Sequence, residues 1–294
     1  MFSLFLGNRS SKYFDYTTSR KIRGEIMFLH TRHTIALLIV VAAFASGACA
    51  ALQPPDADGP RTNTPPYPIA LADPAARLEE ASVAWYQLSQ HYGLADRTAA
   101  SLNPFTGTIE GLPANVGTIA LPKVGDEAQP TEEQIRESLR RFINEWRPLI
   151  GAEPNQLSLV ERTDEASGVK LARYEQRPFR YPLRGEFGKL VIRFSADRRV
   201  VSLSSTCIPN AERLQASIAG LTPKIDANQA VDHVRTQVPA NAGLTARELV
   251  VYARSGKDSS AGLQLYLAWE VQVSNGPMKT IYLDAISDQV LAVA

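Results

Sequence analysis

The side chains best suited to metal binding or nucleophilic catalysis are few in this chain, which has four histidines and two cysteines. Zinc hydrolysis of the HExxH type needs two histidines one helical turn apart, so that both imidazoles reach one metal, and a glutamate between them to activate the metal-bound water. No HExxH occurs, and His30 and His33, which have ligand-like spacing, lie in a segment that we expect to be removed. We expect His91, near a helix end, and His233, on a helix surface, to be exposed. The sequence therefore predicts no metal site and no cofactor.

Nucleophilic catalysis has little support either. The chain has no GxSxG elbow, and Cys207 lies in a strand pattern without a neighbouring histidine or lysine that would lower its pKa. We expect Cys207 to be a small core residue, with a disulfide to Cys49 as the alternative. A Ser/His/Asp triad around His91 or His233 stays open, because triads assemble in space rather than in sequence. We predict that the protein has no catalytic residue and is not an enzyme.

The charge balance argues against nucleic acid as a partner. Lysine and arginine number 31 against 30 aspartates and glutamates, and no basic run is interleaved with aromatic residues. A length of 294 residues with 45% hydrophobic side chains allows one large domain or two ordinary ones, each with its own core.

The N-terminal segment has the layout of a bacterial export signal. An apolar run over 35–44 follows basic residues and precedes a stretch of small residues over 45–50. We assign residues 1–49 to a leader, with Met27 as the more natural start, and 50–73 to a proline-rich, extended tether. A retained membrane anchor is the alternative to removal of the leader.

Cys49 decides how the exported chain is held. The residues Ser46-Gly47-Ala48-Cys49 resemble a lipobox, in which the cysteine becomes the lipidated first residue of a lipoprotein. We therefore expect a lipid anchor on Cys49 that attaches the protein to the membrane of the cell envelope. Ordinary cleavage at this small-residue stretch is the alternative, and it would give a secreted or periplasmic protein.

The first folded part, residues 74–220, reads as helices followed by antiparallel strands. Asp73 and the proline after it predict a helix that ends at Gly93, and the stretch around Asn103–Gly107 predicts a short hairpin. A second helix starts at Thr131 and Gln134, which form a capping box. Its apolar side chains share one face, and four strand patterns follow it, LSLVERT, VKLARYEQ, KLVIRFSA and RVVSLSST.

The second part, residues 221–294, repeats this plan. Asp226 and Gln229 predict the cap of a third helix, which Pro239 ends, and three strands follow. The middle strand alternates, with Leu267 on the side of the helix and Glu270 on a side that faces water or a partner. The predicted fold class is α+β, with two modules that each pack a helix on an antiparallel sheet.

Two stretches resemble known families. The first, from RRFINEWRPLIG to KLVIRFSADRRVVSLSS, resembles the fungalysin/thermolysin propeptide module. The second, LQLYLAWEVQVS followed by TIYLDAISDQVL, resembles the PepSY domain, and Tyr282, Asp284, Ala285 and Val290 match its pattern. Arg180 and Arg199 depart from the propeptide pattern, which has glycine at both places, and the turn at Arg180 is longer. The resemblance covers residues 103–293 and implies cystatin-like and PepSY-like modules.

The resemblance also implies a function without catalysis. Pro-regions of this kind fold first, template a secreted zinc protease and cover its cleft, so we expect an inhibitor or folding assistant of a thermolysin-like metalloprotease. In the family, the end of the PepSY domain leads into the catalytic domain, which places Leu291, Ala292, Val293 and Ala294 beside the partner's cleft. The alternative for these residues is a last strand that completes the sheet. Two other functions stay open: an envelope structural or binding lipoprotein without a protease partner, and the front half of a protease precursor.

Overall fold

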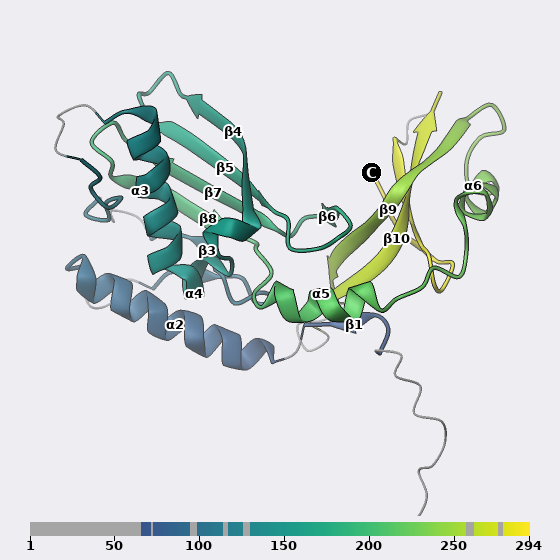
Figure 1. Cartoon of the computed structure of the whole chain (residues 1–294), viewed down its shortest axis with the longest axis horizontal. Helices are drawn as coiled ribbons and strands as arrows, with labels where there is room; N and C mark the ends of the chain where they lie inside the picture. The colour runs from purple at the N-terminus through teal and green to yellow at the C-terminus, as the bar shows by residue number, and fades with distance from the viewer. Residues whose placement is uncertain are drawn as a thin grey trace, which may run out of the picture. The chain divides into compact units, whose positions relative to one another are not determined.

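The computed structural model of the chain describes residues 66–71, 73–94, 99–113, 117–125, 130–256, 262–275 and 279–294. They all fall in one compact unit, Asn63–Ala294. The predicted leader, most of the predicted tether and Cys49 lie outside the described residues. The fold is α+β, as the sequence predicts, with helices packed on largely antiparallel sheets (Figure 1). None of the helices in the described ranges combines the length and the apolar character needed to cross a membrane.

Most helices begin where the sequence provides start signals. The helices of the described residues are α2 (Pro74–His91), α3 (Glu132–Glu145), α4 (Arg147–Ile150), the 3-10 helix η1 (Pro154–Gln156), α5 (Ala211–Ala219) and α6 (Ala227–Arg235). Both predicted capping boxes are confirmed, with Thr131 and Gln134 at α3 and Asp226 and Gln229 at α6 exchanging side-chain and backbone hydrogen bonds. At α2, Asp73 occupies the cap position, but its side chain makes no capping hydrogen bond.

Helix α5 is an addition to the sequence prediction. It follows Asn210, whose φ of 54° is left-handed and whose side chain makes no capping hydrogen bond. Asparagine is a residue type favoured at N-caps, but here its side chain satisfies no backbone N–H of the first turn. The helix is stabilised by packing, because Ile218 is buried, and Leu214 partly buried, in the apolar cluster beneath the larger sheet.

The four strands predicted after α3 form one antiparallel sheet in the order β4-β5-β7-β8. They are β4 (Leu157–Asp164), β5 (Lys170–Gln176), β7 (Lys189–Phe194) and β8 (Val200–Ser205). Helix α3 crosses one face of this sheet (Figure 1), and its Leu139 and Phe142 are buried in one cluster with Leu190 and Ile192 of β7. The predicted hairpin also forms, from β2 (Ser101–Leu102) and β3 (Ile109–Gly111).

The charged hairpin turn between β7 and β8 is confirmed, with one change in its detail. The Ser195 hydroxyl donates to Asp197, and Arg199 Nε lies 2.8 Å from an Asp197 oxygen. The residue with positive φ is Arg198, at 68°. The left-handed position that favours glycine is therefore Arg198 and not Arg199, where the comparison with the propeptide family placed it.

The larger sheet is built on the C-terminal strands. The sequence predicts three strands after α6, and the structure has four, β9 (Gly243–Ser255), β10 (Leu263–Ser274), β11 (Thr280–Asp284) and β12 (Val290–Val293). The sheet runs in the order β12-β11-β10-β9-β6, with β1 also paired to β10. Helix α6 packs Ala230 and Val234 on Val271, Ile281 and Leu283 of this sheet.

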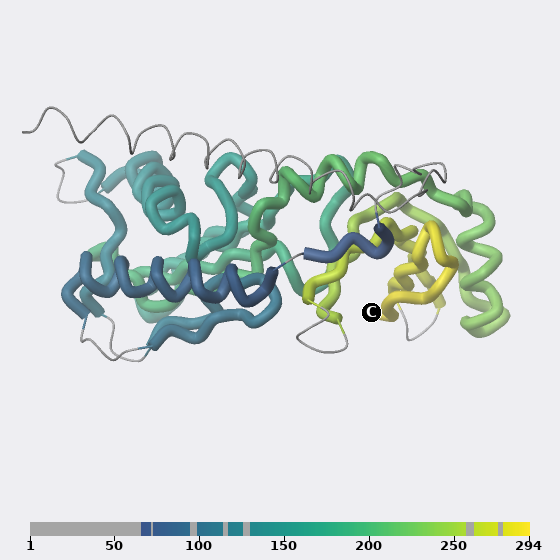
Figure 2. The backbone as a smooth tube through the Cα atoms, turned by 90° about the horizontal axis from the view of Figure 1, so that it is seen from below, coloured from purple at the N-terminus to yellow at the C-terminus, as the bar shows by residue number. Residues whose placement is uncertain are grey.

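Two strands of the larger sheet come from distant parts of the chain. Strand β1 (Ile69–Ala70), at the end of the predicted tether, pairs antiparallel with β10 and lies beside the C-terminal strands (Figure 2). Strand β6 (Leu183–Gly185) pairs parallel with β9. The segment that carries β6 belongs to the long turn after Arg180, which the propeptide resemblance does not account for. Residues on both sides of the predicted boundary near residue 220 therefore share one sheet.

The three tryptophans pack in the cores, as predicted. Trp85 and Trp146 are buried in the cluster between the helices and the four-stranded sheet. Trp269 is half-buried against the α6 cluster, and its Nε1 donates to the carbonyl oxygen of Ile225 at 3.0 Å. These side chains consequently hold helices on sheets and do not line a site.

Candidate functional site

The structure keeps the histidines and the cysteine of the described residues apart. His91 ends α2, with its ring 4.7 Å from that of Tyr92. His233 lies on α6, where Nδ1 is 2.5 Å from an Asp288 carboxylate oxygen. Cys207 is fully buried just after β8, and burial raises its pKa to about 12, so it remains a neutral thiol. Within the described ranges, no group of three or more histidine, cysteine and acidic side chains could hold a metal ion.

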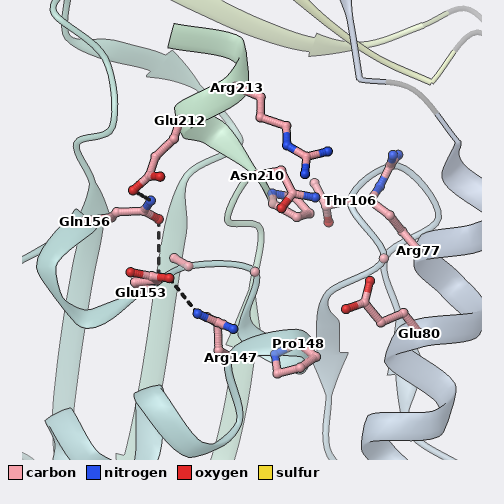
Figure 3. A pocket seen from close by; sticks show the side chains of 14 residues that line it. Arg77, Glu80, Thr106, Arg147, Pro148, Glu153, Gln156, Asn210, Glu212 and Arg213 are labelled. Atoms are coloured by element: carbon pink, nitrogen blue, oxygen red, sulfur yellow. Dashed lines mark hydrogen bonds and ion pairs between the residues drawn. The ribbon is translucent and has the colours of Figure 1, made fainter.

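A polar cavity of about 350 Å³ lies where α2, α4, α5 and the β2–β3 turn meet (Figure 3). Most of its charged groups already have partners. Arg147 lies 2.6 Å from Glu153, Gln156 donates to Glu212, and Arg77 donates to a backbone carbonyl at 2.9 Å. No histidine or cysteine lines it. The cavity therefore offers polar contacts but no imidazole or thiol group.

Asp284, one of the residues matched to the PepSY pattern, caps the turn between β11 and β12. Its carboxylate accepts the backbone N–H groups of Ile286 and Ser287 and the hydroxyl of Ser287. This confirms the sequence interpretation of Asp284 as a turn cap. The structure adds a partner that the sequence did not indicate, because the Tyr67 hydroxyl donates to the same carboxylate at 2.5 Å. Burial, and then the hydrogen bond to Asp284, raise the pKa of Tyr67.

An aromatic surface lies on the side of the larger sheet opposite its apolar clusters. Tyr252 of β9 and Tyr282 of β11 lie on either side of Ala268 in β10, with ring centroids 4.6 Å apart. Glu270 of β10 and Arg184 of β6 adjoin them. We call these five residues the tyrosine face. Burial raises the pKa of both tyrosines, so their hydroxyls remain neutral hydrogen-bond donors at neutral pH.

A charged network fixes one side of the tyrosine face. Arg184 donates from Nε to Glu270 at 2.7 Å and from a terminal nitrogen to Glu248 at 3.0 Å. Glu270 is almost fully buried, and Arg247 lies 3.7 Å from its second oxygen. A buried carboxylate held by two guanidinium groups has little freedom to move. Arg184 therefore ties β6 to β9 and β10 and orders the surface beside the two tyrosines.

The sequence anticipated this side of the sheet only in part. Alternation along β10 predicted a polar side that faces water or a partner, with Tyr266 and Glu270 on it. Both residues are in fact buried, Tyr266 under the ring of Tyr67 and the guanidinium of Arg254. The covering residues come from β6, β9 and the segment just before β1, which no local pattern in β10 reveals.

The predicted partner-binding residues lie at one edge of the same sheet. Leu291, Ala292 and Val293 belong to β12, and Ala294 exchanges backbone hydrogen bonds with Thr280 at 2.8 and 3.0 Å. Ala292 lies opposite Tyr282, beside the tyrosine face. These residues complete the sheet, which is the alternative that the sequence left open. Contact with a partner through β12 stays a prediction.

Comparison with known proteins adds little to this site. No family model matches the chain, and neither does any curated protein sequence. A solved structure of an uncharacterized protein from Eubacterium rectale ATCC 33656 is similar over 74% of this chain and 81% of that one, at 9% identity and a TM-score of 0.28. A likeness this weak carries no argument about fold or function.

Proposed function

We propose that this protein is a non-enzymatic binding protein of two modules, cystatin-like and PepSY-like. Its partner in this proposal is a thermolysin-like metalloprotease, which it inhibits or helps to fold. The observation that carries the proposal is the tyrosine face, an ordered aromatic surface beside edge strand β12. The resemblance of the sequence to protease pro-regions selects the class of partner.

Physical arguments favour binding at this face. Tyrosine rings bury a large contact area while losing little conformational entropy, and they are enriched among residues that dominate binding energy. The rings of Tyr252 and Tyr282 already contact each other, and the adjoining Arg184 is held by Glu270. A partner would therefore pay little for ordering these side chains.

The proposed location follows from the leader. Export with a lipid anchor on Cys49 would place the modules at the cell envelope, and cleavage without lipidation would release them as a secreted or periplasmic protein. The predicted tether between Cys49 and the folded part gives the modules reach from the membrane surface.

An inhibition assay with surface variants tests the proposal. The purified protein is titrated into a thermolysin-like protease, and cleavage of a peptide substrate is followed. Tyr282→Ala and Tyr252→Ala should each raise the inhibition constant about tenfold, equivalent to about 1.4 kcal/mol. Val293→Glu should also weaken inhibition, because it places a charge on edge strand β12, beside the tyrosine face. The Val293 side chain is 51% exposed, so the substitution should leave the fold intact.

The control is Tyr86→Ala, which removes a tyrosine that is 64% exposed on α2, away from the tyrosine face. Circular dichroism must show that every variant is folded. If the tyrosine-face variants inhibit as well as Tyr86→Ala does, this surface is not the binding site. If the unaltered protein neither inhibits the protease nor raises its refolding yield, the protease partner is wrong, and the envelope lipoprotein without such a partner becomes the better explanation.

A further inference from the structure

The two edges of the four-stranded sheet differ in how they are covered. At β8, the segment 119–121 runs along the edge, and the N–H of Val200 donates to Ile119 at 2.8 Å while that of Leu121 donates to Arg198 at 2.9 Å. At the opposite edge, β4 pairs with β5 on one side, and no strand of the described residues pairs with its other side. Outward backbone groups of β4 are therefore available to a further strand.

A groove runs beside this free edge, between β4 and helix α3. It has a volume of about 340 Å³ and is lined by Arg136, Arg140, Ile143, Pro154, Leu157, Leu159 and Tyr174, which together we call the β4 groove. Leu157 and Leu159 are only partly buried against the core. A bulge after Leu159 makes Val160 an extra residue, and its side chain is exposed. The groove thus has an apolar floor that α3 leaves partly open.

Tyr174 contributes a polar group to this apolar floor. Tyr174 is only 9% exposed as a whole residue, and it lines the groove. Burial raises its pKa to about 12, so the hydroxyl keeps its proton at neutral pH. A ligand acceptor in the groove can therefore take a hydrogen bond from this neutral hydroxyl.

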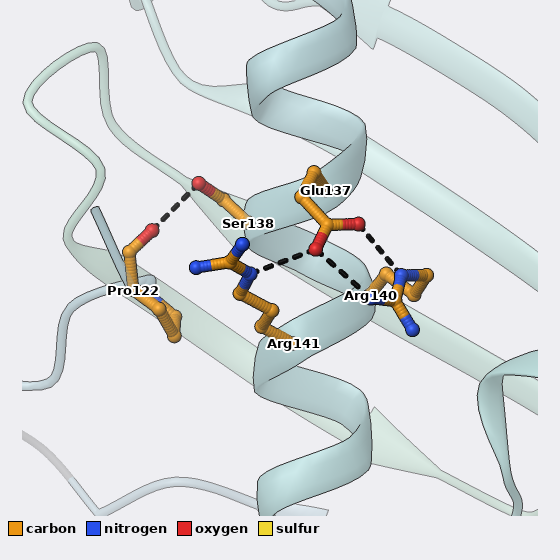
Figure 4. A network of polar contacts seen from close by, with 5 residues as sticks. All are labelled: Pro122, Glu137, Ser138, Arg140 and Arg141. Atoms are coloured by element: carbon orange, nitrogen blue, oxygen red, sulfur yellow. Dashed lines mark hydrogen bonds and ion pairs between the residues drawn. The ribbon is translucent and has the colours of Figure 1, made fainter. Parts of the chain in front are cut away.

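Two arginines one helical turn apart form the wall of the groove. Arg140 and Arg141 approach Glu137 from its two sides (Figure 4), and their hydrogen bonds lower the pKa of Glu137 to about 2. Arg136 has a looser neighbour, Glu132 at 3.8 Å, with both side chains well exposed. Exposed ion pairs of this length contribute little to stability, so Glu132 does not hold Arg136 firmly. Arg136 therefore presents positive charge that a ligand carboxylate can reach, and Arg140 would share its guanidinium between Glu137 and that carboxylate.

We propose that the β4 groove binds an extended acidic peptide segment of a partner protein, which adds to β4 as a fifth strand. Alternate side chains of such a segment point to the same side, so every second one would enter the groove. Glutamate fits it best, because its methylenes would contact Leu157 and Leu159 while its carboxylate meets Arg136, Arg140 and the Tyr174 hydroxyl. This site lies on another sheet than the tyrosine face and does not depend on the proposed function.

Synthetic peptides test strand addition directly. The probe is a fluorescent peptide of eight residues, the length of β4, with glutamate alternating with threonine. Binding to the full protein is measured by fluorescence polarisation. The same peptide with lysine in place of glutamate should not bind. Two further forms carry N-methyl groups on alternate residues, so that each loses the N–H donors of one edge only. One of these two forms should lose binding and the other should keep it.

Charge variants of α3 test the wall. Arg136→Glu and Arg140→Glu should each weaken binding of the acidic peptide about tenfold, whereas Arg141→Glu should not. Arg141 is the matched control, because it shares Glu137 with Arg140 but does not line the groove. Tyr174→Phe, which removes only the hydroxyl, should weaken binding by about threefold.

Several results would overturn the proposal. They are no binding of the acidic peptide, equal binding of both N-methylated forms and the parent peptide, or equal weakening by Arg141→Glu and Arg140→Glu. Sedimentation showing that the protein dimerises through β4 would also overturn it, because a second copy would then occupy the edge. If a variant fails to fold, the N-methylated peptides still decide the question with the unaltered protein.

Discussion

The two main sheets assemble from the chain in different ways. The four-stranded sheet takes all its strands from one continuous stretch, residues 157–205. The larger sheet adds two borrowed strands to its own four, with β1 from the far N-terminal side and β6 from the loop between β5 and β7. The first sheet therefore depends on local hairpins, and the second depends on contacts between residues far apart in sequence. Substitutions at the long-range contacts should therefore destabilise the larger sheet more than the four-stranded sheet.

The largest effect is expected for Asp284→Ala. This buried carboxylate accepts four hydrogen bonds, three from its own turn and one from Tyr67, and its loss leaves their donors unsatisfied. We expect the free energy of unfolding to fall by about 3–4 kcal/mol, measured by urea denaturation. Asp197→Ala, in the exposed turn of the other sheet, is the control and should have little effect. If both variants lost a comparable free energy of unfolding, the larger sheet would not depend more than the four-stranded sheet on contacts between residues far apart in sequence.

A smaller loss is expected when β6 is released. Arg184→Ala leaves the almost buried Glu270 with Arg247 alone, and we expect a destabilisation of about 2 kcal/mol, because Arg184 itself is partly exposed. Hydrogen exchange should speed up in β9 and β10 but not in β5 and β7. The double variant Arg184→Met with Glu270→Leu should recover stability, since no buried charge is left unpaired. A double variant less stable than Arg184→Ala would show that the ion pair itself holds the strand.

Tyr67→Phe should destabilise the protein by about 1 kcal/mol at neutral pH, since it removes one hydrogen bond to a charged acceptor. The pKa of Tyr67 is raised in the folded state, so this contribution is complete below the unfolded pKa of about 10 and is lost as pH rises above it. The difference in unfolding free energy between the two proteins should therefore shrink in alkaline solution. A difference that stays constant from neutral pH to pH values well above 10 would argue against the bond.

The smallest losses of stability are expected at the helix caps, and they should be equal for α3, on the four-stranded sheet, and α6, on the larger sheet. Thr131→Ala and Asp226→Ala each remove a capping box at the start of a helix, and each should cost about 1 kcal/mol. Thermal or urea denaturation measures both. Unequal losses would show that the helices, and not only the sheets, differ in how strongly they depend on local signals.

Local signals explain how much of the fold could be predicted from the sequence. Thr131 and Asp226 start helices through side chains within their own first turn, and the strands β4, β5, β7 and β8 carry their pattern in consecutive residues. Strands β1 and β6 are short and are defined by partners far along the chain, so no local pattern identifies them. Helix α5 was missed although Asn210 is of a type favoured at N-caps; it is held by the packing of Ile218 in the apolar cluster, which no local pattern shows.

The candidate site divides in the same manner. Tyr282 and Asp284 were selected from the sequence by their resemblance to the PepSY pattern, and Asp284 caps its turn as predicted. Tyr252 and Arg184 were missed. Their roles exist only after β9 and β6 lie beside β10, and pairing of that kind is set by the folded sheet rather than by spacing in the sequence.

The bond between Tyr67 and Asp284 joins residues separated by 217 positions. A ribosome makes Tyr67 and β1 near the beginning of the folded part, but their partners in β10 and in the last turn are made near the end. The four-stranded sheet can form before the last strands are in place, because its own strands are complete by Ser205. Closure of the longest loop is slower than closure of local hairpins. The first strand of the folded part to be synthesised is therefore expected to be among the last to find its place.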